Sequence, residues 1–324
     1  MTSLSGKAKR HLVAAVVLLA VAAFGIVGAS FAFGADKAVP NASPDYTKLL
    51  LETTTSVRDS GVLDKVVIPD FEKRYPGITV SYVAVGSGAA LAAAAAGNCD
   101  AVIVHSPDAE KTLLASGGLT MRLPFAYNYF IIVGPKGDPA HVSQTKSAVA
   151  AFKAIAAYGK KLVKVHSKRV LFISRGDNSG TNAKELQLWA AAGVTINPAS
   201  LPSWYQETGS GMAATLQVAN QKNAYTLTDV ATWLNVKSTL PSLFVRLTAR
   251  KDLLNQYSID LCNQAQHNSV NSTGAELLAE WLVSAGGQRA LAAYHIKGRQ
   301  VYYPNSYKIS VTNLPPAPAP GAAP

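Results

Sequence analysis

Short apolar runs alternate with longer amphipathic stretches from Lys48 onward. Short runs bounded by Gly, Ser, Asn and Asp predict strands, and apolar residues three or four positions apart predict helices. The predicted strands lie at 48–52, 79–85, 101–105, 129–134, 170–174, 224–228 and 257–261. The predicted helices lie at 62–74, 89–96, 109–116, 149–158, 182–192, 212–222, 230–235 and 275–285. This alternation is typical of an α/β protein built on a parallel sheet.

In four places an apolar strand runs into a loop of Gly, Ser and Thr that opens a helix. These are LLLETTTS (49–56), YVAVGSG (82–88), LFISRGDNSGT (171–181) and WYQETGSGM (204–212), and the strand of the last is the least defined. The first N–H groups of a helix lack partners inside it and carry partial positive charge, so such an end binds anions. Each loop alone also fits an ordinary helix cap, as Ser179 does. The four together favour an anion site, provided that they converge.

Arg175 is the strongest single candidate for contact with an anion. It follows a predicted strand and stands six residues before Thr181. Its guanidinium offers fixed, paired donors that suit the oxygens of an oxyanion. A pairing of Arg175 with Asp177 is the alternative, and both can hold at once.

The beginning of the chain has the layout of a secretory signal peptide. Lys7, Lys9 and Arg10 precede an apolar run at 12–27, and small residues follow around 32–34. We therefore expect residues 1–34 to be removed and the protein to be secreted or periplasmic, with an uncleaved membrane anchor as the alternative. At the other end, residues 314–324 are rich in Pro and Ala and are predicted to be disordered.

Charge and cysteine content narrow the functional classes. Loss of residues 1–34 would lower the formal net charge by three, from +11 to +8, a positive field that draws anions. The basic residues are scattered and no aromatic stripe accompanies them, so nucleic acid is not an expected partner. No His and Cys cluster has metal-ligand spacing. After export, the two cysteines, Cys99 and Cys262, could form a disulfide.

The chain resembles the tungstate-binding periplasmic proteins of tungstate ABC transporters. The matching strings are TTTS followed by Asp59-Ser60-Gly61, AVGSG, VIVHSP, NYFIIVGP, SRGDNSGT with Lys184-Glu185, WYQETGSGM and AYTLTD. They run in order from about Leu49 to Asp229, with looser similarity to Pro304. Ordered matches of this kind are far more specific than one Gly-rich loop.

The resemblance implies a type II periplasmic-binding-protein fold, with two α/β lobes and a ligand cleft between them. Lobe 1 would comprise 45–128 plus 247–310 and lobe 2 would comprise 129–246, with crossing strands near 129–134 and 243–247. The family pattern places the anion contacts on Thr54, Thr55, Ser56, Ser87, Arg175, Ser179, Gly180 and Thr181, and less strongly on Thr228. The expected partners are an ABC permease and its ATPase subunit, and the expected state is a monomer without cofactor.

Two residues depart from the family pattern. The family typically has His after the SGT string and Arg after the Thr-Asp of a later strand, where this chain has Asn182 and Val230. The second change removes a cation, which bears on the choice between tungstate and molybdate.

Other functions stay open at this point. A phosphate-binding protein carries a similar Arg and Ser-Gly-Thr loop, although phosphate keeps a proton at neutral pH and calls for a carboxylate acceptor. A secreted hydrolase with a Ser nucleophile is a lower-ranked alternative, because no Gly-x-Ser-x-Gly string lies at a strand-to-helix turn. His105 follows a predicted strand and is assigned a structural role.

Overall fold

The computed structural model describes residues 45–248 and 250–305, all of which belong to one compact unit. The predicted signal peptide (1–34) and the predicted disordered tail (314–324) lie outside the described residues.

The structure contains the following strands and helices. The strands are β1 (Lys48–Thr54), β2 (Thr79–Val85), β3 (Ala101–Val104), β4 (Leu119–Pro135), β5 (Phe172–Ser174), β6 (Tyr205–Glu207), β7 (Thr226–Asp229), β8 (Leu243–Leu247), β9 (Leu254–Cys262), β10 (His295–Ile296), β11 (Arg299–Gln300) and β12 (Tyr303–Pro304). The α-helices are α2 (Thr55–Ser60), α3 (Ile68–Arg74), α4 (Ser87–Ala95), α5 (Pro107–Ala115), α6 (Ala148–Lys164), α7 (Gly180–Ala191), α8 (Met212–Lys222), α9 (Val230–Val236), α10 (Ser272–Val283) and α11 (Ala285–Ala293). A π-helical segment, Leu63–Val67, leads into α3, and 3₁₀ turns lie at Val142–Gln144, Lys237–Thr239 and Lys251–Leu253.

The main sheet has eight strands and mixed direction, so the prediction of a parallel sheet was wrong in part. Its order is β12-β4-β9-β3-β1-β2, and β7 and β8 also pair with β4. The pairs β1·β2 and β1·β3 are parallel, but every pair that involves β9 or β4 is antiparallel. Strands β5 and β6 form a separate parallel pair.

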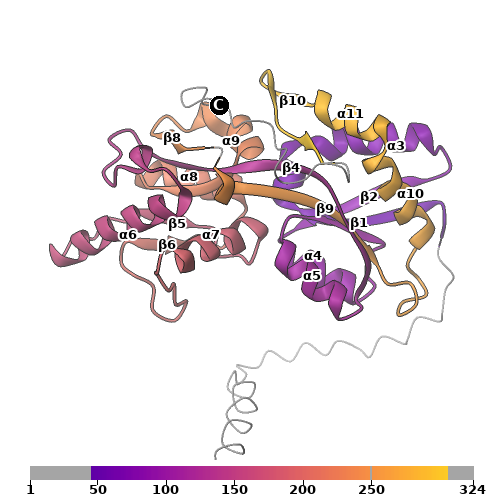
Figure 1. The fold of residues 1–324 in the computed structure, drawn as a ribbon, viewed down its shortest axis with the longest axis horizontal. Helices are drawn as coiled ribbons and strands as arrows, with labels where there is room; N and C mark the ends of the chain where they lie inside the picture. Colours follow the sequence, from indigo (N-terminus) through magenta and orange to yellow (C-terminus); the bar gives the residue numbers. More distant parts are fainter. Residues whose placement is uncertain (1–44, 249, 306–324) are drawn as a thin grey trace, which may run out of the picture. The chain divides into compact units, whose positions relative to one another are not determined.

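Strand β4 links the two halves of this sheet (Figure 1). Its pairing with β9 ends at Tyr129, and its pairing with β7 begins at Phe130. Only its second half was predicted, because Pro124 interrupts the pattern of the first half. A proline inside a strand is tolerated at a bulge, and the β4·β9 register shifts between Pro124 and Ala126.

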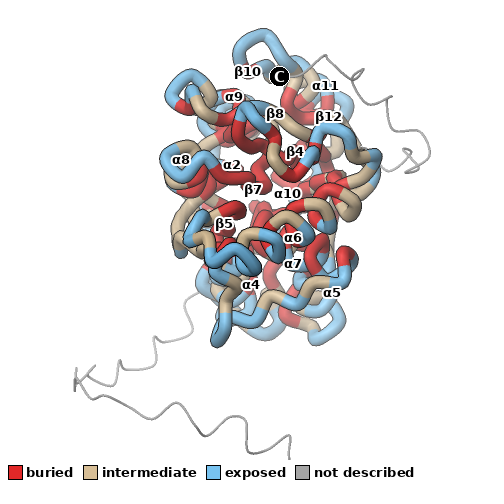
Figure 2. Tube along the Cα trace, turned by 90° about the vertical axis from the view of Figure 1, so that its left-hand side faces the viewer, coloured by how far each residue is buried: buried red, intermediate tan, exposed pale blue. Residues whose placement is uncertain are grey.

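Buried side chains form separate core regions on the two sides of this link. One region collects side chains from β1, β3, β9 and α10, and the other collects them from β5, β7, α6 and α8. We call these regions lobe 1 and lobe 2. Helix α9 belongs to both, because Ala231 and Leu234 pack in lobe 1 while Trp233 packs in lobe 2. Figure 2 shows the buried segments of β5 and β7 in red, consistent with their fully buried residues.

The remaining departures from the predicted elements are local. Helix α2 was missed because it has only six residues. The predicted helix 275–285 ends earlier, since Ser284 has extended backbone and its side chain caps α11 by accepting from Gly287 N. The crossing strand predicted near 243–247 is β8, which pairs only with the lobe 2 part of β4, so the chain returns to lobe 1 after Leu247.

The two cysteines lie at one edge of lobe 1. Their sulfurs are 3.5 Å apart, and both residues are buried free thiols. The structure thus brings together the side chains whose pairing the sequence left open, without a bond between them.

No helix in residues 45–248 or 250–305 is both long and apolar enough to cross a membrane.

Candidate oxyanion site

The four Gly, Ser and Thr loops meet between the lobes. The backbone N–H of Gly180 donates to Ser87 Oγ at 3.1 Å, and that of Gly88 donates to Asn178 O at 3.3 Å. These bonds join the first turns of α4 and α7. A Cβ built on Gly211, the N-cap of α8, would lie 3.6 Å from Thr55 Oγ1, which places the fourth loop against the first.

Arg175 connects the two lobes at this point. The residue is 2% exposed. Its Nη1 donates to Ser56 Oγ at 3.3 Å and its Nη2 to Thr55 Oγ1 at 3.2 Å. Its Nε and Nη2 also donate to Asp177 Oδ2, at 3.1 and 2.5 Å. The expected pairing of Arg175 with Asp177 is therefore present together with its contacts to Thr55 and Ser56.

Five hydroxyl groups at the site share one property: their oxygens accept from protein N–H groups. None of these hydroxyls donates its own hydrogen to another group among the described residues. The bonds are Val57 N to Thr54 Oγ1, Arg175 Nη2 to Thr55 Oγ1, Arg175 Nη1 to Ser56 Oγ, Gly180 N to Ser87 Oγ and Asn182 N to Ser179 Oγ. A hydroxyl has one hydrogen to donate and two lone pairs. With lone pairs engaged by the protein, the hydrogens are left to donate to a ligand.

The acidic groups near Arg175 are occupied within the protein. Asp177 uses Oδ2 on Arg175 and Oδ1 on the N–H of Ser179. Asp229 caps α9, accepting from the N–H and hydroxyl of Thr232 at 2.9 and 2.6 Å. Burial raises the pKa of Asp229, while the hydrogen bonds from Thr232 and, after them, the charge of Arg175 oppose the rise. Neither carboxylate has an oxygen free of hydrogen bonds.

Thr181 and Thr228 differ from the other candidate residues. Thr181 is 1% exposed, and its Oγ1 has no hydrogen-bond partner among the described residues. A buried hydroxyl without a partner costs free energy, so this group is suited to a ligand that supplies one. Thr228 instead donates to Asp229 O at 3.3 Å. Because the hydroxyl hydrogen of Thr228 is already donated within the protein, Thr228 is a weaker candidate for contact with the ligand.

His105 packs against Gly180 in the first turn of α7. The sequence alone predicted only a structural role for this residue. A Cβ built on Gly180 would approach His105 Nδ1 and Cε1 to 2.8 Å. Asn255 Nδ2 donates to Asn128 Oδ1 and Tyr257 Oη, so Asn255 Oδ1 accepts the hydrogen of His105 Nδ1 at 3.0 Å. His105 Nε2 is then an acceptor, and it has no partner among the described residues.

The surroundings keep His105 neutral. Burial first, and then the charge of Arg175, lower the pKa of His105 to about 4. Nothing in the sequence around His105 signals this arrangement, because Asn255 is 150 positions away.

The fourth loop supports Arg175 through the backbone. Thr208 N donates to Ser174 O at 3.1 Å and Gly209 N to Arg175 O at 2.8 Å. Gly209 has φ of +61°, a conformation that glycine adopts without strain. The sequence pattern identified this loop but assigned none of its residues to the site.

The two departures from the family pattern have separate structural settings. Asn182 accepts from Asn178 N at 3.1 Å and donates to Ser174 Oγ at 3.2 Å, so it braces the loop that carries Arg175. Val230 opens α9 and packs, partly buried, against the lobe 1 core.

A cavity of about 470 Å³ adjoins the site between the lobes. Its lining includes Gly180 together with His105 and Ser106, whose Nε2 and Oγ atoms are buried without partners among the described residues. At its rim, Gln187 Nε2 of lobe 2 donates to Asp108 Oδ2 of lobe 1 at 2.9 Å.

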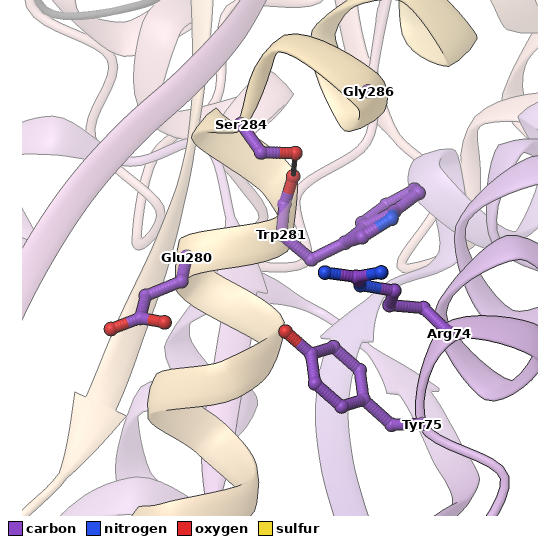
Figure 3. Close-up of a pocket in the computed structure, with 6 residues that line it drawn as sticks. All are labelled: Arg74, Tyr75, Glu280, Trp281, Ser284 and Gly286. Atoms are coloured by element: carbon purple, nitrogen blue, oxygen red, sulfur yellow. Dashed lines mark hydrogen bonds between the residues drawn. The ribbon is translucent and has the colours of Figure 1, made fainter.

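A second cavity, of about 520 Å³, lies between α3 and the junction of α10 and α11, and contains none of the candidate residues (Figure 3). It is lined by Arg74, Tyr75, Glu280, Trp281, Ser284 and Gly286. Within the described part of the chain, no three His, Cys, Asp or Glu side chains gather into a metal site.

Comparison with known proteins identifies the class to which this fold and site belong. The family model of the PBP superfamily domain matches residues 38–285, so the chain belongs to that superfamily. The chain is 34% identical to the tungstate-binding protein TupA of Peptoclostridium acidaminophilum over 305 residues, which cover 92% of this chain and 98% of the relative. It is 33% identical to TupA of Campylobacter jejuni, over 76% of this chain and 87% of the relative. Within the superfamily, it belongs to the family of these TupA proteins.

Solved structures agree with this assignment. The tungstate-binding protein TupA from Desulfovibrio alaskensis G20 has a TM-score of 0.66 and 34% identity, covering 80% of this chain and 99% of that chain. The structure described as the tungstate ABC transporter from Geobacter sulfurreducens has a TM-score of 0.65 and 36% identity, covering 76% and 98%. The mixed α/β fold with two lobes is therefore the fold of its relatives.

Proposed function

We propose that the protein is an extracytoplasmic solute-binding protein that captures a tetrahedral oxyanion, tungstate first and molybdate second, and delivers it to an ABC importer. The observation that carries the proposal is the cluster of hydroxyl groups around Arg175. Their oxygens accept from the protein, which leaves their hydrogens for a ligand. The names of the relatives support tungstate as the ligand and an ABC permease with its ATPase as partners.

The proposed mechanism is reversible binding without covalent chemistry. The anion would exchange its hydration shell for hydroxyl hydrogens, N–H groups of the α4 and α7 first turns, and the remaining Nη1 hydrogen of Arg175. Charge-assisted hydrogen bonds of this kind are roughly twice as strong as neutral ones. Burial of the site would exclude competing water, and the ligand's charge would be balanced by Arg175.

The same contacts favour an anion that carries no proton. Asp177 and Asp229 are already hydrogen-bonded within the protein, so they are poor acceptors for a protonated phosphate. The hydroxyl hydrogens, the N–H groups and Arg175 are all donors, and donors suit a fully ionised tungstate or molybdate. Beside these loops and within the described residues, His105 Nε2 and Ser106 Oγ are buried without partners, and both atoms are able to accept a hydrogen bond. We therefore rank phosphate below tungstate and molybdate.

A serine hydrolase receives no support from the geometry. His105 Nδ1 is hydrogen-bonded to Asn255 Oδ1, and no serine is a partner of His105 in the described part of the chain. The pairing of a serine with a base, on which such an enzyme depends, is therefore missing at this site.

The proposal is tested by the melting temperature of the protein, stripped of ligand, with tungstate, molybdate, sulfate, phosphate or vanadate added separately. A ligand present at 100 times its Kd stabilises the folded state by about 2.7 kcal/mol, or roughly 5–10 °C for a protein of this size. We expect this rise with tungstate and a smaller rise or none with phosphate. A rise with phosphate alone would place the protein among phosphate binders, and no rise with any anion would contradict oxyanion binding.

A further inference from the structure

Cys99 and Cys262 are brought together by the pairing of two strands of lobe 1. Ala101 of β3 is opposite Leu261 of β9, and Cys262 N donates to Asp100 O at 3.1 Å beyond the last paired residues. The two sulfurs, from residues 163 positions apart, are 3.5 Å from each other. Their separation in sequence makes this contact a consequence of the folded sheet.

Both thiols are enclosed, although not equally. Cys99 and Cys262 are 3% and 1% exposed and pack among Ala90, Leu91 and Val102. Cys99 also lines a cavity of about 260 Å³. A hydrogen bond with Cys99, followed by burial, raises the pKa of the Cys262 thiol well above its ordinary value.

We propose that Cys99 and Cys262 form a disulfide that staples the edge of lobe 1 remote from the oxyanion site. A disulfide has an S–S distance near 2.05 Å, so the sulfurs must approach by about 1.5 Å, within the reach of small side-chain rotations. The oxidant is an external disulfide, of the kind available in the compartment proposed for this protein.

The reaction balances as two thiol–disulfide exchanges. The thiolate of Cys99, which lines the cavity, attacks one sulfur of the external disulfide, forms a mixed disulfide and releases the first thiol. Cys262 Sγ then attacks Cys99 Sγ, forms the bond within the chain and releases the second thiol. The external disulfide gains two electrons, and the two cysteine protons pass to the released thiolates.

The position of the bond predicts what it changes. Strand β3 runs parallel to β1, and β1 ends at Thr54, beside the oxyanion site. Cys99 precedes β3, so it lies at the N-terminal ends of these two parallel strands, whereas Thr54 lies at the C-terminal end of β1. The bond should therefore raise stability without altering ligand affinity.

The experiment compares full-length protein refolded with oxidised glutathione and the same protein refolded with dithiothreitol. Titration of thiols in denaturant should give none in the first sample and two in the second, with both samples at the mass of one chain. The disulfide would close a loop between two residues that are 163 positions apart. Closure of this loop should raise the melting temperature by roughly 5–15 °C. Neither readout uses an oxyanion, so the result is independent of the proposed function.

Cys99→Ala supplies the matched control, because its melting temperature should be the same after both treatments. Tungstate titration of the two wild-type samples should give Kd values within twofold. Two titratable thiols after oxidative refolding, or a disulfide that joins two chains, would overturn the proposal. Equal melting temperatures of fully oxidised and fully reduced wild-type protein would overturn the stapling role.

Discussion

Replacement of Arg175 by alanine is the most informative perturbation of the site. It removes the guanidinium that donates to Thr55 and Ser56 at the start of α2 and that pairs with Asp177 at 2.5 Å. It also removes the cation that would face the ligand. Loss of one partner of a buried, hydrogen-bonded charge pair costs about 2–5 kcal/mol. Arg175→Ala should therefore weaken tungstate binding by roughly 30- to 5,000-fold.

Two further variants separate charge, geometry and stability. Arg175→Lys keeps the charge but loses the paired donors, so its Kd should lie between those of wild type and Arg175→Ala. Arg122→Ala removes a partly buried arginine, which is 2.6 Å from Glu110 and belongs to lobe 1. That control should lower the melting temperature and leave Kd unchanged.

Isothermal titration calorimetry at matched protein concentrations gives the tungstate Kd of the wild type and of the three variants, Arg175→Ala, Arg175→Lys and Arg122→Ala. A Kd of folded Arg175→Ala within about threefold of wild type would refute the role assigned to this residue. A similar loss of affinity in Arg122→Ala would show that instability, and not the contact with the ligand, explains the effect.

Three other predictions concern single groups at the site. Thr181→Val removes a buried, unpaired hydroxyl; calorimetry should show tungstate binding about 5- to 10-fold weaker, and the ligand-free melting temperature should not fall. Gly180→Ala places a Cβ 2.8 Å from His105 ring atoms and should cost about 1–3 kcal/mol in denaturant unfolding, whereas Gly77→Ala, with nothing within 4 Å, should be nearly neutral. The pKa of His105 is lowered from 6.5 to about 4, so the unfolded chain binds a proton in this pH range that the folded protein does not. Stability should fall as pH drops from 6.5 towards 4, by about 3 kcal/mol more in wild type than in His105→Gln. An equal pH dependence in the two proteins would contradict this assignment.

Local signals predicted many element positions well. The strand 79–85 and the helix 212–222 have the predicted bounds, because Gly86 follows the first and Gly211 precedes the second. Half of β4 escaped prediction, since Pro124 within its first half is accommodated by a bulge that only the partner strand reveals.

The arrangement of the helices and strands in space was less predictable than their positions along the chain. The loop strings identified Arg175 and Ser87 as candidates, but the meeting of α4 with α7 depends on how the two lobes face each other. The direction of β9 could not be read from its apolar pattern, which is the same for parallel and antiparallel partners. His105 gave no signal of its setting, because its hydrogen-bond partner comes from a distant strand.

The central claim is most directly tested by calorimetric titration of the ligand-free protein with tungstate, followed by competition with molybdate and with phosphate. We expect a single saturable site per chain, displacement of tungstate by molybdate at comparable concentration, and little displacement of tungstate by a large excess of phosphate. Absence of saturable heat with tungstate, confirmed by an unchanged melting temperature, or tighter binding of phosphate than of tungstate, would contradict it.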